Sequence, residues 1–331
     1  MPEIRIDALT GLRTIVAPDR ATRGGSGTGL EVSPVPALAA ADDPFREGHE
    51  HQTPPELHAV SSDPHRLPDT PGWSVRVVPN RYPALRPDAA SDASEASARP
   101  DLFGAVPATG AHEVLITAPD PVMTLAELPA EQVVTAVEVW RQRMRTHADA
   151  AYVHLHVNER PEGGASREHT HAQLYAMDFV PALVARERER FGAYATQTMG
   201  SNLLGDLLQE EVRMRDRIVA IDDEAVLLAP YASRAPYQLM LVPRVPRMRF
   251  EDEGPSGARL LHEGLSRLAR RFGAPPPLTL WVRTAPRGAE HFCWHVDVLP
   301  RLTPLAGLEL GTGVHITTVS PELAAAELRA V

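Results

Sequence analysis

The chain contains no lysine and only one cysteine. All 33 of its basic residues are therefore arginines, a compositional preference that we do not connect with function. The missing amine excludes Schiff-base chemistry on a lysine and the lysine of a nucleotide-binding P-loop. Cys293 alone cannot build an intrachain disulfide framework or a multi-cysteine zinc site.

Long apolar runs are also missing. The first residues lack the apolar core of a secretory signal, and no segment is apolar over the length needed to cross a bilayer. Acidic residues outnumber basic ones by 43 to 33, which gives a formal net charge of -10. A general nucleic-acid binder usually carries a net basic surface, so any anion site in this chain must be local. We expect a cytoplasmic protein without membrane or nucleic-acid partners.

The composition is that of an ordinary globular protein, except for two segments that are poor in apolar residues. With 331 residues, 43% of them hydrophobic and 23% charged, the chain can bury a large core in one elaborated domain or two fused ones. Residues 86–100 are almost wholly Pro, Ala, Ser, Asp, Glu and Arg, which predicts a flexible insert. Residues 24–35 are rich in Gly, Ser and Pro and are expected to form a cover or a linker.

The same order of predicted elements occurs twice along the chain. The first half has strands at 75–80 and 112–117, a helix at about 129–147, and strands at 152–158 and 170–177. The second half has strands at 225–230 and 237–243, a helix around 256–272, and strands at 278–284 and 293–300. Short alternating strands with few helices predict an α+β protein with a mainly antiparallel sheet. We assign residues 1–195 to an N-terminal domain and residues 196–331 to a C-terminal domain.

The most informative stretch lies between residues 158 and 173. A strand leads into a glycine-rich loop, and a second strand with alternating polar residues follows. Glycine lets the backbone approach an anion closely, a serine hydroxyl adds a donor, and alternation places every second side chain on one face. The residues concerned are Gly163, Gly164 and Ser166 in the loop, and His169, His171 and Gln173 in the strand. A histidine in this position could attack a phosphorus atom.

The duplication pairs His171 and Gln173 with His295 and Asp297 in the second half. Only the first copy is preceded by a Gly-Gly-Ala-Ser loop. An isolated strand histidine is usually a satisfied, partly buried residue, and this reading is preferred for His295 as well as for His112 and His156. The first half is therefore predicted to be catalytic and the second half supportive.

Further motifs accompany this stretch. They are Leu9-Thr10-Gly11, the segment from Ala17 to Arg23, Pro44-Phe45 with Gly48-His49-Glu50, Thr53 to Glu56, and Pro79 to Ala84. With Asn158, Gly164, Ser166, His171 and Gln173, they resemble the motifs of the galactose-1-phosphate uridylyltransferase branch of the histidine triad superfamily. The resemblance extends over nearly the whole chain. It implies a duplicated histidine-triad-like fold, in which a mainly antiparallel sheet forms a half-barrel with flanking helices.

The resemblance also implies a reaction and a set of site residues. In the implied reaction, His171 attacks the α-phosphorus of a nucleotide sugar, with a UDP-sugar favoured, and forms a nucleotidyl-histidine that a sugar 1-phosphate then discharges. Gln173 and Ser166 would hold phosphate oxygens during this transfer. The remaining implied contacts are Asn80, Asn158, Gly163 and Gly164 to the nucleotide, Glu309 to the sugar, and Arg20 and Arg23 to phosphates from the neighbouring subunit of a homodimer.

The chain departs from the family at its metal positions. Asp43, Arg46 and Pro121 stand where three zinc ligands are expected, and of the four ligands only His169 remains. One imidazole does not hold zinc, so we predict no metal there and expect Asp43 and Arg46 to pair. A second family metal site maps to Glu187, Arg283, His295 and Asp297, where the arginine argues against a metal. We therefore predict no metal cofactor.

Three functions are compatible with the sequence. The leading one is a nucleotidyltransferase that acts on a sugar 1-phosphate. The second is a nucleotide-sugar or dinucleotide phosphorylase or hydrolase that uses the same histidine. The third is a non-catalytic nucleotide-binding protein, which the intact His171, Gln173 and Ser166 disfavour. Leu308 stands where the galactose enzymes have an aromatic residue, so the sugar stays open.

Overall fold

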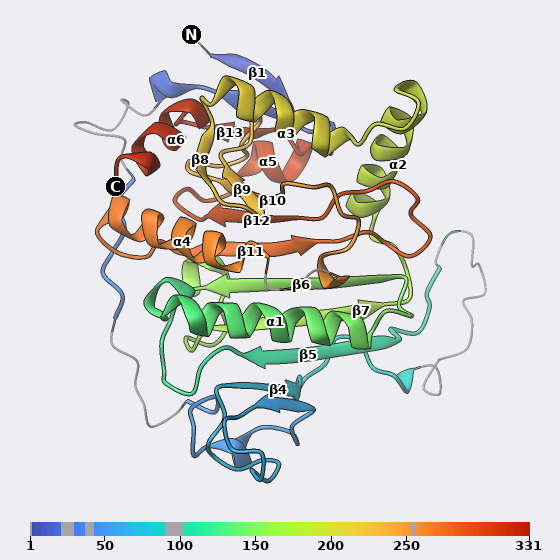
Figure 1. Ribbon diagram of the computed structural model, residues 1–331, viewed down its shortest axis with the longest axis vertical. Coiled ribbons are helices and arrows are strands. Elements are labelled where there is room, and N and C mark those ends of the chain that lie inside the picture. The colour runs from blue at the N-terminus through green and yellow to red at the C-terminus, as the bar shows by residue number, and fades with distance from the viewer. Residues whose placement is uncertain are drawn as a thin grey trace.

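The computed structural model describes residues 2–20, 30–36, 43–89, 102, 104–252, 254 and 256–331 of the chain (Figure 1). Arg23 and most of the predicted insert at 86–100 lie outside the described residues, as does the first part of the segment 24–35. Among the described residues, no helix is long and apolar enough to span a membrane.

The described elements are strands joined by a few helices. The strands are β1 (Glu3–Ile6), β2 (Arg13–Val16), β3 (His58–Val60), β4 (Val75–Pro79), β5 (Gly110–Ile116), β6 (Tyr152–Glu159), β7 (His171–Met177), β8 (Ile218–Ile221), β9 (Ala225–Leu228), β10 (Leu239–Pro243), β11 (Leu278–Arg283), β12 (His295–Pro300) and β13 (His315–Thr317). The helices are α1 (Ala130–Thr146), α2 (Ala182–Gln197), α3 (Leu203–Met214), α4 (Ala258–Phe272), α5 (Gly307–Thr312) and α6 (Pro321–Arg329).

One large sheet organises the molecule. Its strand order is β3-β4-β5-β7-β6-β11-β12-β10-β9-β8, and neighbouring strands pair antiparallel throughout. The order β4-β5-β7-β6 in one half is mirrored by β9-β10-β12-β11 in the other, and the halves join where β6 pairs with β11. The predicted α+β class with a mainly antiparallel sheet is confirmed; the sheet is open rather than closed.

Helices α1 and α4 lie side by side on one face of this sheet (Figure 1). Helix α1 buries Val133, Val137 and Trp140, which recur at helical spacing and form one apolar stripe. The stripe packs on every second residue of the strands, such as Leu155 and Leu174. Because strand side chains alternate, the residues between these apolar ones point to the opposite face.

The opposite face differs between the two halves. Over the second half, α2 and α3 cover it and form a separate apolar cluster that includes Phe191, Leu204 and Met240. A small sheet, β1-β2-β13, also lies on this half, and Thr14 on β2 donates to the carbonyl of Ala232 at 3.2 Å. Over the first half the face carries His171 and Gln173, which line a cleft together with residues of the segment 44–54.

Candidate active site

His171 begins β7 and is held by its own strand. Its Nδ1 lies 2.8 Å from the carbonyl oxygen of His169, which can only accept, so Nδ1 carries the proton and Nε2 keeps a free lone pair. Burial lowers the pKa of His171, which keeps the ring neutral at physiological pH. A neutral imidazole with one nitrogen fixed by a carbonyl is a competent nucleophile through the other.

A cleft of about 190 Å³ opens beside this histidine. Four of the predicted site residues line it: His171, Gln173, Ser166 and Asn80. The edge of the Phe45 ring packs against His171, with the ring centres 5.1 Å apart. The cleft therefore combines an apolar wall with amide and hydroxyl donors, which is typical of small-molecule sites.

Gln173 is held by a hydrogen-bond network. The backbone N–H of Ala84 donates to Nδ1 of His112 at 3.2 Å, so the proton of this imidazole resides on Nε2. Nε2 donates to the carbonyl oxygen of Gln173 at 3.0 Å. The Tyr175 hydroxyl donates to the same Gln173 oxygen at 3.3 Å. With its oxygen occupied, Gln173 is left with its NH₂ group as a donor to a ligand.

The loop between β6 and β7 is shaped by contacts to the second half. A Cβ on Gly163 would lie 2.5 Å from the carbonyl oxygen of Leu278, and Thr279 donates to the Gly163 carbonyl at 3.0 Å. Gly164 has φ of 92°, which glycine adopts readily. Asn158 donates to the Gly164 carbonyl at 3.4 Å. Gly163 is thus required for close packing on β11, and its contact with phosphate, like those of Gly164 and Asn158, stays a prediction.

The other predicted contacts lie elsewhere on this chain. Arg20 is exposed after β2, and Glu309 accepts the N–H of Ala306 at the start of α5, at 3.0 Å. Of the described residues that line the cleft, the cations are Arg81 and Arg167, which the sequence analysis did not select. Neither Arg20 nor Glu309 is among the described residues that line the His171 cleft of the same chain.

The residues at the first metal position do not fit zinc. Nδ1 of His169 lies 2.7 Å from a carboxylate oxygen of Asp43, and Nε2 lies 2.9 Å from the carbonyl oxygen of Ala118, so neither ring nitrogen is available. The predicted pairing of Asp43 with Arg46 is wrong, because the carboxylate faces the buried imidazole while Arg46 is exposed. Opposite charge and short sequence separation suggested Arg46, but Asp43 contacts His169 instead.

The residues at the second metal position do come together, as an ion-pair cluster. Nε of Arg283 lies 3.1 Å from a carboxylate oxygen of Glu187, and Nε2 of His295 lies 3.7 Å from Asp297. All four side chains are buried. The guanidinium already supplies a positive charge to this cluster, so these residues do not fit a metal either.

Sequence reasoning missed two contributors to the site. His112 had been assigned a structural role, yet it contacts Gln173 from the neighbouring strand; Phe45 lies in a quoted motif but was given no function. For His112 the signal was its position on the same face of β5 as Val114, which pairs with Gln173. His156, also judged structural, stacks near Tyr175, and burial lowers its pKa to about 4.

A duplicated antiparallel sheet, with a strand histidine fixed through Nδ1 beside a glycine-containing loop, defines a protein of the histidine-triad-like class. Residues 1–181 match the family model described as galactose-1-phosphate uridyl transferase, N-terminal domain. The chain therefore belongs to the galactose-1-phosphate uridylyltransferase family, as the motifs predicted.

Relatives with known names support this assignment. An ADP-glucose phosphorylase of Arabidopsis thaliana is 25% identical over 346 residues, covering 100% of this chain and 93% of the relative. A galactose-1-phosphate uridylyltransferase of Haemophilus influenzae is 28% identical over 270 residues, covering 77% and 76%. The crystal structure of an Arabidopsis thaliana ADP-glucose phosphorylase with bound ADP-glucose superposes with a TM-score of 0.81 at 24% identity, covering 100% of this chain and 99% of that chain. The protein is an enzyme of the hexose-1-phosphate nucleotidyltransferase kind.

Proposed function

We propose that the protein transfers a nucleoside monophosphate, with UMP favoured, from a nucleotide sugar to a sugar 1-phosphate through a covalent intermediate on His171. The observation that carries this proposal is the orientation of the imidazole. Its Nδ1 is bound to the His169 carbonyl, and its Nε2 is left as the nucleophile at a cleft that Gln173 and Ser166 also line.

In the first step, Nε2 of His171 attacks the α-phosphorus of the nucleotide sugar. A P–N bond forms, the bond from phosphorus to the bridging oxygen breaks, and the sugar phosphate leaves with that electron pair. The Gln173 NH₂ group and the Ser166 hydroxyl donate to the nonbridging oxygens, where negative charge develops. Arg81 and Arg167 supply positive charge at the same cleft.

In the second step, a phosphate oxygen of the acceptor attacks the same phosphorus atom. The P–N bond breaks and Nε2 regains its lone pair, so the enzyme returns to its starting state without a net proton change on the ring. His112 supports both steps because it keeps the Gln173 carbonyl occupied and the amide NH₂ turned toward the cleft. The two steps share one site, which gives ping-pong kinetics.

A second candidate is a nucleotide-sugar phosphorylase, in which inorganic phosphate takes the place of the sugar 1-phosphate. The observation that favours it is the similarity to the plant ADP-glucose phosphorylase over the full length of the chain. The chemistry at His171 is the same in both candidates. The experiments must therefore identify the nucleobase of the donor and the acceptor of the nucleotidyl group.

Intact-protein mass spectrometry tests the covalent step. The purified protein is mixed separately with UDP-, ADP-, GDP- and dTDP-glucose, with His171→Ala and His295→Ala in parallel. His295 is the duplicated counterpart of His171 and lies outside the cleft, so it is the matched control. We expect the mass to grow by one nucleoside monophosphate in the wild type and in His295→Ala, and not in His171→Ala. An adduct that persists in His171→Ala would refute the proposal.

A chase of the isolated adduct identifies the acceptor. Glucose 1-phosphate, galactose 1-phosphate and inorganic phosphate are added one at a time, and the rate of adduct loss is measured. Fast discharge by a sugar 1-phosphate supports the transferase, whereas discharge only by inorganic phosphate supports the phosphorylase. If neither an adduct nor released sugar phosphate is found with any donor, the non-catalytic nucleotide-binding alternative replaces both.

We also infer a homodimer in which each cleft receives Arg20 and Glu309 from the neighbouring subunit. The supporting observation is that neither residue lines the cleft of its own chain. Inactive His171→Ala and Arg20→Ala chains are co-expressed to test this. Random pairing should restore about a quarter of wild-type activity, because half of the dimers hold one intact site. No recovery would contradict the shared site, while the adduct experiment would be unaffected.

A further inference from the structure

The second half contains a cavity at the position that corresponds to the cleft of the first half. The two equivalent cross-strand rows are Val78, Val114 and Gln173 on β4, β5 and β7, and Leu228, Met240 and Asp297 on β9, β10 and β12. The last residue of each row lines the respective space. Strands β6 and β11 lie between β7 and β12, so the two sites are roughly 14 Å apart at about 4.8 Å per strand.

The walls of this cavity are apolar. Helix α3 contributes Leu204, Leu207 and Leu208, and the chain between β1 and β2 contributes Leu9 from the other side. The volume is about 290 Å³, larger than that of the first-half cleft. This volume is large enough for a small organic molecule. An occupant must therefore present an apolar body to α3.

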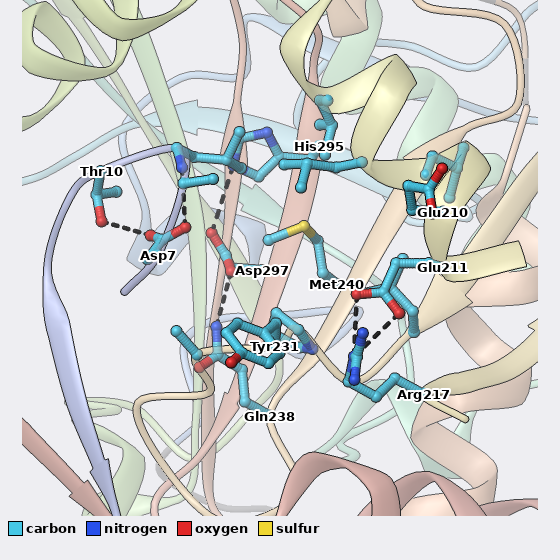
Figure 2. A pocket seen from close by; sticks show the side chains of 18 of the residues that line it. Asp7, Thr10, Glu210, Glu211, Arg217, Tyr231, Gln238, Met240, His295 and Asp297 are labelled. Atoms are coloured by element: carbon cyan, nitrogen blue, oxygen red, sulfur yellow. Dashed lines mark hydrogen bonds and ion pairs between the residues drawn. The ribbon is translucent and has the colours of Figure 1, made fainter. Parts of the chain in front are cut away.

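The inner end of the cavity is polar and includes Asp297, His295 and Gln238 (Figure 2). Two of its hydrogen-bond acceptors lack a donor at hydrogen-bond distance among the described residues. One carboxylate oxygen of Asp297 accepts from Gln238 at 3.0 Å. The other lies 3.7 Å from Nε2 of His295, too far for a hydrogen bond. Nδ1 of His295 faces the carbonyl oxygen of Cys293 at 3.3 Å, so Nδ1 carries the proton and Nε2 is an acceptor. Two acceptors therefore face each other across a gap that suits a donor.

Three carboxyl groups and two guanidinium groups lie around this end, and burial raises the pKa of Glu187 to about 7, so this carboxyl is partly neutral at pH 7. Asp297 is balanced by Arg234 at 3.6 Å, and Glu187 is balanced by Arg283 at 3.1 Å. The carboxylate of Asp7 adds to these, and it interacts electrostatically with His295 and Glu187.

The rim of the cavity adds no positive charge that would reverse this balance. Arg217 pairs with Glu211 at 3.0 Å and with Glu322 at 2.8 Å, Glu322 also pairs with Arg5 at 2.8 Å, and Glu210 pairs with Arg213. Acidic residues still outnumber arginines among the residues that line the cavity, which disfavours a phosphate there.

We propose that this cavity is a second ligand site and that it binds a small organic amine, with the ammonium group between Asp297 and His295 and the apolar body against α3. The ammonium group supplies both the donor that the two acceptors lack and the charge that offsets Asp7. The apolar body fills space that water fills at a cost. This inference does not depend on the reaction at His171.

The test measures binding of n-hexylammonium to the full-length protein by isothermal titration calorimetry at pH 7 and constant ionic strength. Hexanol and hexanoate have the same chain without the cation and serve as matched ligands. Asp297→Asn keeps the side-chain shape and an oxygen for Gln238 but removes the charge, and Asp7→Asn is a second variant should the first fail to fold. His171→Ala controls for binding at the cleft.

We expect saturable binding of one hexylammonium per chain that Asp297→Asn or Asp7→Asn weakens at least tenfold and that His171→Ala leaves unchanged. Hexanol should bind at least tenfold more weakly, and hexanoate should not bind. The proposal is refuted if no hexylammonium binds, if hexanoate binds equally well, or if binding is lost in His171→Ala but kept in both acidic-residue variants. Stoichiometric Zn²⁺ that displaces the amine would assign the site to a metal and would also refute it.

Discussion

Glu159 should make the protein less stable as the pH rises, and Glu159→Gln should remove this dependence. Glu159 ends β6 just before the loop of the active site and is 1% exposed. One carboxyl oxygen accepts the N–H of Leu125 at 2.6 Å, and the other has no hydrogen-bond partner among the described residues. Burial raises the pKa of this carboxyl to about 8, and the nearby Glu127 adds to the effect.

The sign and size of the effect follow from the two pKa values. The unfolded carboxyl loses its proton near pH 4.5, whereas the folded one keeps it up to about pH 8. Between these values the unfolded state binds fewer protons, so the free energy of unfolding falls as the pH rises. At 1.36 kcal/mol per pH unit, the loss between pH 5 and pH 7 amounts to roughly 2 to 3 kcal/mol. Glutamine stays neutral, keeps an oxygen for Leu125 and places an NH₂ group at the unpaired position.

Urea unfolding at pH 5, 6, 7 and 8, followed by circular dichroism, measures the difference. The free energy of unfolding of Glu159→Gln minus that of the wild type should grow with pH over this range. Glu162→Gln, an exposed carboxyl three residues away, controls for the general loss of a negative charge and should run parallel to the wild type. If Glu159→Gln also runs parallel to the wild type, the folded protein does not hold a neutral Glu159 and the reasoning fails.

Three further predictions test the site. His112→Phe should lower kcat by roughly fivefold, because it removes a hydrogen bond worth about 1 kcal/mol to Gln173; additive effects of His112→Phe and Gln173→Ala in steady-state kinetics would show that His112 does not act through the amide. Gly163→Ala should destabilise the protein by about 1 to 3 kcal/mol in thermal denaturation, because the Cβ would lie 2.5 Å from the Leu278 carbonyl oxygen; an unchanged melting temperature would contradict the packing role. Chelator treatment should leave activity unchanged, since both ring nitrogens of His169 are engaged, and elemental analysis that finds stoichiometric zinc would overturn this.

The sequence predicted best what depends on local periodicity. The helix predicted at about 129–147 is confirmed as α1, and alternation correctly placed His171 and Gln173 on one face of β7, whereas His169, expected on the same strand, precedes it. The repeated order of elements correctly anticipated the mirrored halves of the sheet. These features follow from the spacing of apolar residues, which needs no knowledge of distant partners.

Contacts between segments far apart in the chain could not be predicted from the sequence. His112 meets Gln173 only because β5 and β7 pair in one particular register, and the pattern of either strand alone does not set that register. Asp43 meets His169 across 126 residues, a pairing that a single sequence cannot distinguish from the nearer Arg46. The domain boundary at residue 195 stays a prediction, because one continuous sheet runs through both halves.

The junction of the two halves constrains how such a gene can evolve. The Gly163 carbonyl accepts from Thr279, and β6 pairs with β11 along most of its length. The second half therefore holds the β6–β7 loop of the first half in place. A gene cut at this junction would produce a chain with β6 as an open strand edge, and open edges recruit other chains. The second half, which lacks the nucleophilic histidine, is therefore needed for structural reasons, because its loss would expose the catalytic half to aggregation.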